Sequence, residues 1–430
     1  MQTQLAPQYE GTTAGQQAEA VLRQCVHCGF CNATCPTYKQ TGNELDGPRG
    51  RIYLMKQVFE GQAPTRTTQQ HLDACVGCRH CESTCPSGVQ YHELLAVGQA
   101  AVDAQVERPW KEKALRWAIR KVVPSAWFVP ALVVGRWVRP MLPKAWQERV
   151  PLRPPFAPPA WPDRKKGMHA RQVLLLKSCV QRGLRPHIDV ATARVLDSLG
   201  IRAGVSRKSG CCGALQGHMG DLEGAKARAR TNIDAWWPWV ISKAPVEAIL
   251  INASGCGAWV KDYGQLLADD PAYADKAKRI AALAKDPGEL LPQWLPLLKR
   301  RLGRRPEGSL GTMTFHPPCS LSHVHKLSSA AQPGPIELGL RELGFEVHLA
   351  KRDSHQCCGA GGAYSLTQPE MAIQLRDDKL RALDETDPHV IASANIGCIV
   401  HLQGGTNIPV KHWIEMLDEA LTRQESVPTI

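Results

Sequence analysis

Two stretches of the chain carry the same order of apolar and amphipathic segments. Each has a short apolar run that predicts a buried strand, then an amphipathic segment of helical period that ends on a glycine. A second apolar run follows and predicts another strand. The paired segments are Gln172–Leu176 and Thr312–Phe315, Ala191–Gly200 and Ile336–Gly344, and Val246–Asn252 and His389–Ala394. This repetition predicts two duplicated α/β domains between about residues 170 and 425.

The longest apolar run without a charge is Val122–Gly135, which has 14 residues and two prolines. A membrane-spanning helix needs about 20 apolar residues, so we expect no integral membrane segment. The first residues, Met1–Pro7, have neither the basic nor the apolar region of a secretory signal. The expected compartment is therefore the cytoplasm.

Composition narrows the possible functions. The 430 residues include 52 Lys and Arg against 40 Asp and Glu, a net charge of +12 with histidine neutral. This length suggests two to four domains. The basic residues are dispersed and no nucleic-acid-binding module is recognisable, so we expect no nucleic-acid partner. In a reducing compartment the 16 cysteines indicate metal ligands or redox chemistry rather than disulfides.

Eight of the cysteines form two copies of one run within residues 25–85. Each copy has the spacing C-x2-C-x2-C-x3-C-P, which is typical of bacterial two-cluster ferredoxins, where the fourth cysteine ligates the other cluster. Zinc motifs usually pair two C-x2-C units and lack this third and fourth cysteine. The expected ligands are Cys25, Cys28, Cys31 and Cys85 for one [4Fe–4S] cluster, and Cys75, Cys78, Cys81 and Cys35 for the second.

The other eight cysteines repeat a different pattern: a single cysteine, then Cys-Cys-Gly, then Gly-Cys. Adjacent cysteines cannot bridge each other without strain, but both can face one metal ion. A metal centre in at least one repeat is expected, and a zinc site, a redox-active dithiol and buried structural thiols are the alternatives. The candidate ligands are Cys179, Cys211, Cys212 and Cys256 in one repeat and Cys319, Cys357, Cys358 and Cys398 in the other. Nearby histidines that could also ligate are His316, His323 and His355.

With these motifs the chain resembles the iron–sulfur subunits of bacterial glycolate oxidases over almost its whole length. The doubled ferredoxin run and the two Cys-Cys-Gly (CCG) repeats give the wider superfamily, which includes heterodisulfide reductase, glycerol-3-phosphate dehydrogenase and lactate-utilisation proteins. The segments Glu44–Leu54, Asn232–Pro238 and Ile391–Cys398 strengthen the match to glycolate oxidase. The resemblance, together with the repeats, predicts an α+β multidomain fold. A mainly α-helical, ferredoxin-like domain with two [4Fe–4S] clusters would precede two duplicated α/β cysteine-rich (CCG) domains.

The resemblance implies an electron-transfer subunit. Partner subunits that carry FAD would oxidise glycolate to glyoxylate, and this chain would pass the electrons toward a membrane quinone or another respiratory acceptor. The chain itself shows no dinucleotide fingerprint and no P-loop, which agrees with FAD being held only by the partners. The alternatives are the same relay in a D-lactate or glycerol-3-phosphate dehydrogenase complex, or a thiol/disulfide enzyme similar to heterodisulfide reductase.

One departure from the heterodisulfide reductase pattern concerns the end of each CCG repeat. There the heterodisulfide reductase type has C-x-x-C, whereas this chain has Ala253 and Asn395 in place of the first cysteine of the pair. Each repeat keeps four cysteines, which suffice for one further iron–sulfur cluster or a zinc ion. The five-cysteine noncubane cluster of that family is therefore not expected, and a disulfide reductase activity is less favoured.

The expected domains are 1–105 (ferredoxin-type), 106–166 (connector), 167–300 (first CCG) and 301–430 (second CCG). The connector is rich in Trp, Pro and basic residues. Such a composition suits a membrane-surface segment, a docking surface for a partner subunit, or a linker packed on the chain's own domains. With the resemblance, it predicts a cytoplasmic protein held peripherally at the inner face of the cytoplasmic membrane.

Overall fold

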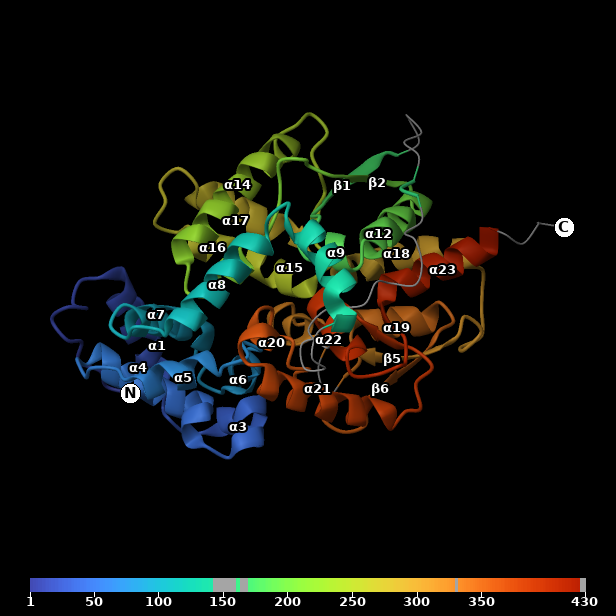
Figure 1. The fold of residues 1–430 in the computed structure, drawn as a ribbon. Helices are drawn as coiled ribbons and strands as arrows, with labels where there is room; N and C mark the ends of the chain where they lie inside the picture. The colour runs from blue at the N-terminus through green and yellow to red at the C-terminus, as the bar shows by residue number, and fades with distance from the viewer. Residues whose placement is uncertain (142–159, 163–168, 329–331, 426–430) are drawn as a thin grey trace.

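The computed structural model describes residues 1–141, 160–162, 169–328 and 332–425 (Figure 1). It confirms the predicted α+β multidomain fold. A helical N-terminal region, blue in Figure 1, lies beside two α/β regions, one green to yellow and the other orange to red. The proposed boundaries at 105, 166 and 300 stay predictions.

The N-terminal region is built around three helices, α1 (Thr13–Gln24), α4 (Pro48–Phe59) and α7 (Tyr91–Asp103), whose apolar faces meet in one buried core. Leu22, Met55 and Leu94 in this core are fully buried. Shorter helices surround it and carry the cysteine runs. They are α2 (Phe30–Thr34), α3 (Pro36–Thr41), the 3₁₀ turn Glu44–Asp46, α5 (Arg66–Asp73) and α6 (His80–Thr84).

Each α/β region contains one four-stranded parallel sheet, and the two sheets have the same topology. In the first region the order is β2-β1-β3-β4, and in the second it is β6-β5-β7-β8. The strands of the first are β1 (Arg171–Leu175), β2 (Ile201–Gly204), β3 (Ile249–Leu250) and β4 (Ala284–Lys285). Those of the second are β5 (Thr312–His316), β6 (Glu346–Leu349), β7 (Ile391–Ser393) and β8 (Val410–His412). The predicted duplication is confirmed.

Helices connect the strands, as parallel pairing requires. In the first region they are α11 (Gln181–Leu184), α12 (His187–Ser198), α13 (Ala214–Gly217), α14 (Leu222–Val240), α15 (Ser254–Lys261), α16 (Tyr263–Leu266), α17 (Ala274–Leu283) and α18 (Pro287–Leu302). In the second they are the π-helical turn Ser320–Val324, α19 (Pro335–Glu342), α20 (Tyr364–Thr367), α21 (Pro369–Asp384), α22 (Ile396–Gln403) and α23 (Trp413–Glu425). As predicted, glycines with positive φ, Gly200 and Gly344, follow α12 and α19.

The two α/β regions share a hydrophobic core. Helix α18 follows the first sheet along the chain, yet its Leu291 and Trp294 pack in one buried cluster with Ile336 of α19. Helix α12 packs against α23, where Arg194 Nε lies 2.9 Å from the carboxylate of Asp418. The two sheets are therefore held together as one body.

The connector contains two helices, α8 (Trp110–Val122) and α9 (Phe128–Val138), followed by the 3₁₀ turn Arg139–Met141. They run from the N-terminal region toward α12 (Figure 1). Arg108 just before α8 pairs with the carboxylates of Asp73 and Asp103, and Phe128 of α9 packs against Gly183. Within the described residues, none of the helices combines the length and the apolarity needed to cross a membrane. The rest of the expected connector, residues 142–159 and 163–166, lies outside the described residues.

Candidate metal centres

The first predicted ligand set gathers at one pocket near the surface. Cys25, Cys28, Cys31 and Cys85 all line it, and Cys81 of the second set reaches the same pocket. Cys28 is exposed. Burial raises the pKa of Cys31 to about 11, so without a metal ion this thiol is protonated at neutral pH. A bound cation would favour the thiolate, as metal ligation requires.

The second predicted set lies deeper, between the N-terminal region and the second CCG region. Burial, followed by the charges of Cys78 and Cys75, raises the pKa of Cys81, and Cys35 adds to this effect. Cys78 packs onto a buried cluster that includes Val76 and Cys357. The structure thus brings the members of each set close to one another, while the ligand assignment itself stays a prediction.

The two cysteine runs have the same unusual backbone. His27 and Gly77, at equivalent positions of the two runs, have φ angles of 59° and 70°. Gly29 and Arg79 are also equivalent and have φ angles of 86° and 61°. Left-handed residues turn the chain sharply, which lets successive thiols face one space. Arg79 is anchored by ion pairs of its guanidinium with Glu82 at 2.9 Å and, across the domain interface, with Asp262 at 3.2 Å.

A buried cation, Arg51 of α4, lies beside the second set and was missed by sequence reasoning. Its side chain is 1% exposed. Nη1 donates a hydrogen bond of 3.2 Å to the hydroxyl of Thr37, which in turn lies 3.2 Å from Cys35 Sγ. Nη2 has no hydrogen-bond partner among the described residues and lies 3.8 Å from the carboxylate of Asp46. An incompletely paired buried cation beside Cys35 and Cys75 suits a site that carries negative charge when loaded.

In the first CCG region the four predicted cysteines form a chain of thiol contacts: Cys179 with Cys211, Cys211 with Cys212, and Cys212 with Cys256. The N–H of Gly213 points at Cys211 Sγ, 3.5 Å away. Hydrogen bonds from Cys179 and Cys212 lower the pKa of Cys211. Gly213 has a φ of 96°, so this turn needs the glycine that follows the cysteine pair.

The second CCG region repeats this arrangement. Cys319 contacts Cys357, Cys357 contacts Cys358, and Cys358 contacts Cys398. The N–H of Gly359 lies 3.4 Å from Cys357 Sγ. Gly359 has a φ of 83°, and a Cβ there would lie 2.5 Å from the carbonyl oxygen of Ala372. The glycine is therefore required both by its conformation and by the close approach of α21.

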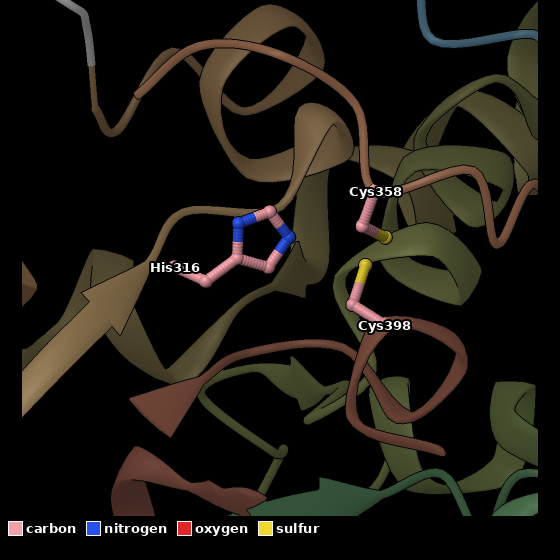
Figure 2. A group of neighbouring side chains, drawn as sticks. All are labelled: His316, Cys358 and Cys398. Carbon is pink, nitrogen blue, oxygen red and sulfur yellow. The ribbon is translucent and has the colours of Figure 1, made fainter. Parts of the chain in front are cut away.

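A buried lysine and a buried histidine lie near the four cysteines of the second CCG region. Lys379 Nζ donates to the carbonyls of Asp353 and Ser354, and burial lowers the pKa of this lysine to about 8 against the attraction of nearby thiols. A ring nitrogen of His316, Cys358 Sγ and Cys398 Sγ all lie within 4.8 Å of one another (Figure 2). Burial, with a smaller contribution from Lys379, holds the pKa of His316 well below its ordinary value, so the ring is neutral.

The other two candidate histidines lie elsewhere. His323 stacks on His80 with ring centroids 4.2 Å apart, and His355 meets the edge of the same ring at 4.8 Å. His80 belongs to the second cysteine run. His323 and His355 therefore contribute to the interface between the N-terminal and second CCG regions rather than to the donor group around Cys358.

The two replaced cysteine positions have different surroundings. Ala253 is fully buried in the shared core. Asn395 bridges the two CCG regions, because its Nδ2 donates to Cys398 Sγ at 3.5 Å while its Oδ1 accepts from the N–H of Gly255 at 3.4 Å. In the second region an amide thus supports the thiol at the position where a C-x-x-C motif would supply a fifth ligand.

Comparison with known proteins agrees with this geometry. Residues 21–89 match the model of a 4Fe-4S dicluster domain, and residues 173–261 and 313–403 each match the model of a cysteine-rich domain. An Escherichia coli glycolate oxidase iron–sulfur subunit is 48% identical over 99% of this chain and 100% of its own length. The chain belongs to the family of glycolate oxidase iron–sulfur subunits. It is an iron–sulfur protein and a component of an oxidoreductase complex in which it serves electron transfer.

More distant relatives align with different shares of this chain. A Bacillus subtilis protein named as a probable glycolate oxidase iron–sulfur subunit is 29% identical over 90% of this chain. A lactate utilization protein A from Exiguobacterium is 26% identical, but it aligns with only 58% of this chain while 98% of its own length is covered. The glycolate oxidase family thus accounts for both the dicluster region and the two cysteine-rich regions.

Proposed function

We propose that this chain carries electrons from FAD-containing partner subunits, which oxidise glycolate to glyoxylate, toward a membrane quinone or another respiratory acceptor. The observation that supports glycolate is the full-length identity of 48% with a glycolate oxidase iron–sulfur subunit. Sister complexes that act on D-lactate or glycerol-3-phosphate are the alternative, since the substrate site would lie on another chain. The lactate-utilisation relative aligns with little more than half of this chain.

The proposed cofactors are two [4Fe–4S] clusters, held by the Cys25, Cys28, Cys31 and Cys85 set and by the Cys75, Cys78, Cys81 and Cys35 set. Further iron–sulfur or zinc centres are proposed for the CCG cysteines. When bound, a [4Fe–4S] cluster accepts and releases one electron at a time at a potential set by its surroundings. The chain's own contribution is to group the thiolates, exclude water on the inner side, and place Arg51 beside the second set.

The two predicted ligand sets differ in exposure, which favours a direction for transfer. Val26 and Phe30, beside the first set, are 69% and 62% exposed, and Cys28 is exposed as well. The corresponding Val76 and Cys78 of the second set pack against the second CCG region. We infer that the electron donor docks at the exposed apolar rim around Cys28. The second set then lies on the path into the body of the protein.

The connector supports a peripheral contact with the inner face of the cytoplasmic membrane. None of the residues of α9 is buried, and Trp127, Val134 and Trp137 on and before it are exposed, Trp137 by 83%. These positions recur with helical spacing, so they share one face. Basic residues at the end of α8, Arg120 and Lys121, would favour an anionic lipid surface. A partner subunit covering this face is the competing interpretation.

The test is to purify the chain anaerobically from its own host, together with the subunits that bind to it, and to follow the visible absorbance of the clusters. Glycolate, D-lactate and glycerol-3-phosphate are added separately. Bleaching by glycolate alone is the expected result. Bleaching by another substrate alone would move the protein to a sister complex. No bleaching by any substrate, in a preparation that retains flavin, would contradict the relay and favour a thiol/disulfide activity.

The matched variants are Cys28→Ser and Cys398→Ser. We expect Cys28→Ser to abolish electron transfer to a quinone analogue, while glycolate still reduces the flavin of the partner subunits. Unchanged transfer by Cys28→Ser would contradict the proposed role of this set. Cys398→Ser lies in the second CCG region and reports whether that region is needed for transfer.

A further inference from the structure

His316 is a buried histidine whose ring is left without hydrogen bonds. His316 is the last residue of strand β5 and is 0% exposed. Its backbone carbonyl accepts a hydrogen bond from Ser393 Oγ at 3.0 Å. Neither Nδ1 nor Nε2 has a hydrogen-bond partner among the described residues. Buried polar atoms are nearly always satisfied, and a buried exception calls for an explanation such as a bound ion.

The ring faces two thiols that come from other parts of the fold. Figure 2 shows the imidazole directed toward the sulfur atoms of Cys358 and Cys398. One donor atom from each of the three residues lies within 4.8 Å of the other two, and all three residues are buried. In a tetrahedral zinc site with bonds of about 2.0–2.3 Å, the donor atoms are roughly 3.3–3.8 Å apart. The three donors therefore need only a small contraction to hold one ion.

The first CCG region has no counterpart of this histidine. His316 lies three residues before Cys319, and the residue three positions before Cys179 is Leu176. Leu176 is fully buried among the apolar residues of the first region's core. The first region can therefore offer four thiols at its centre, whereas the second offers an imidazole in addition.

We propose that His316, Cys358 and Cys398 bind a single zinc ion in the second CCG region. Mixed thiolate and imidazole donors in tetrahedral arrangement are typical of zinc. A fourth position remains, and Cys357 is the neighbour best placed to occupy it, because its thiol contacts that of Cys358. The ion would be held whichever substrate the complex oxidises, so this proposal stands apart from the choice of glycolate.

The ion would connect three segments at the carboxyl edge of the second sheet. His316 ends β5, Cys358 lies in the loop after β6, and Cys398 is in the first turn of α22. Cys398 is in the amino-terminal turn of α22, which is the positive end of the helix dipole. Asn395 Nδ2 donates to the same sulfur at 3.5 Å. Zinc is not redox-active, so the proposed role is structural.

The test is elemental analysis of the full-length chain, prepared anaerobically without a histidine tag. Wild-type protein is expected to contain about one zinc ion per chain beside its iron. His316→Leu, which copies the first region, should lose most of the zinc and keep its iron. His316→Cys should retain the zinc, since a thiolate can replace the imidazole. The matched control is His401→Leu on α22. The ring of His401 is hydrogen-bonded to the carbonyl of Ala372, away from the proposed site, so this variant should keep the zinc.

Three results would overturn the proposal. The first is zinc that is unchanged in His316→Leu. The second is wild-type protein without zinc in which His316→Leu instead loses about four iron atoms, because the centre would then be an iron–sulfur cluster. If His316→Leu does not fold, X-ray absorption at the zinc edge of wild-type protein decides. A first shell with both sulfur and nitrogen supports the site, and a shell of sulfur alone overturns it.

Discussion

The hydroxyl of Tyr364 donates a hydrogen bond of 3.2 Å to the carbonyl oxygen of Ala74, the residue that precedes Cys75. Tyr364 belongs to α20 of the second CCG region, and Ala74 lies directly before the second cysteine run. The tyrosine ring packs in the same buried cluster as Val76 and Cys357. Two residues 290 positions apart in the sequence thus fasten a predicted cluster-binding loop to the neighbouring domain.

Removing that hydroxyl should weaken the interface, while the packing of the ring against Val76 and Cys357 remains. Tyr364→Phe leaves the carbonyl of Ala74 without this donor, and we expect the free energy of unfolding to fall by about 1 kcal/mol. Urea unfolding under anaerobic conditions measures this loss. The control is Tyr273→Phe, whose hydroxyl bonds to Asp234 at the surface and whose loss should cost less than about 0.5 kcal/mol. Equal effects in the two variants would argue against a special role for the interface bond.

Paired serine variants test whether the fourth cysteine of each run crosses to the other cluster. If it does, Cys28 and Cys85 share one cluster, and the double variant Cys28→Ser/Cys85→Ser should lose about four iron atoms per chain. Cys28→Ser/Cys35→Ser should then lose about eight, because it damages both clusters. Iron analysis of anaerobic protein gives both numbers. The reverse order of losses would mean that each run binds its own cluster.

Arg51 should tune the reduction potential of the inner site. A cluster gains negative charge on reduction, and a buried cation beside Cys35 and Cys75 favours that state. Arg51→Gln should therefore shift the potential of that cluster downward, on the order of 60 mV. Arg51→Lys, which keeps the charge, should shift it less. Redox titration followed by electron paramagnetic resonance measures the change, and equal shifts in both variants would indicate a steric rather than an electrostatic effect.

Asp189 should make stability depend on pH in an unusual direction. Burial raises its pKa to about 6, against hydrogen bonds from Asn252 and Gln181. The unfolded chain releases this proton near pH 4 and the folded chain only near pH 6, so the folded state binds more protons between these values. This group therefore contributes stability at low pH that is lost as the pH rises from about 4 to 6.

The corresponding variant is Asp189→Asn, which keeps the acceptor oxygen for both hydrogen bonds and carries no charge. At pH 7 it should be more stable than wild type by about 1–3 kcal/mol, and near pH 4 the difference should vanish. Urea unfolding at the two pH values provides the measurement. A difference that stays constant with pH would show that the carboxyl group of Asp189 does not titrate in this way.

The exposed face of α9 should account for membrane binding. Trp127→Ser/Trp137→Ser removes two large exposed aromatic side chains, and we expect binding of the complex to anionic vesicles to weaken at least about tenfold. Ile241→Ser, at an exposed apolar site on another part of the surface, is the control and should bind as wild type does. Retained binding by the tryptophan variant, or binding that does not respond to salt, would contradict the membrane interpretation.

Much of the fold could be predicted because the determining signals are local or repeated. The apolar runs around Val173 and Phe315, and the glycines that end α12 and α19, follow directly from strand and helix chemistry. The spacing of the first eight cysteines restricts which thiols can share a space. The family followed from the same motifs together with the segment Glu44–Leu54, and the full-length comparison bears it out.

Residues whose role depends on three-dimensional convergence could not be found in this way. Arginine is usually solvated, and nothing near Arg51 in the sequence indicates that α4 buries it beside the second cysteine run. His316 was one of three comparable histidines, and only the meeting of β5, the loop after β6 and α22 sets it apart from His323 and His355. The same holds for Asn395, whose amide reaches Gly255 only because the two sheets share a core.

The contact between Val76 and the second CCG region also has a consequence for biogenesis. The loop of Cys75 and Cys78 is covered by Tyr364 and Ala372 once the two regions have docked. With the proposed cluster on Cys75 and Cys78, iron and sulfide would have to reach this loop before the two regions dock. We therefore expect loading of the inner site to precede docking, whereas the rim around Cys28 stays accessible in the finished protein.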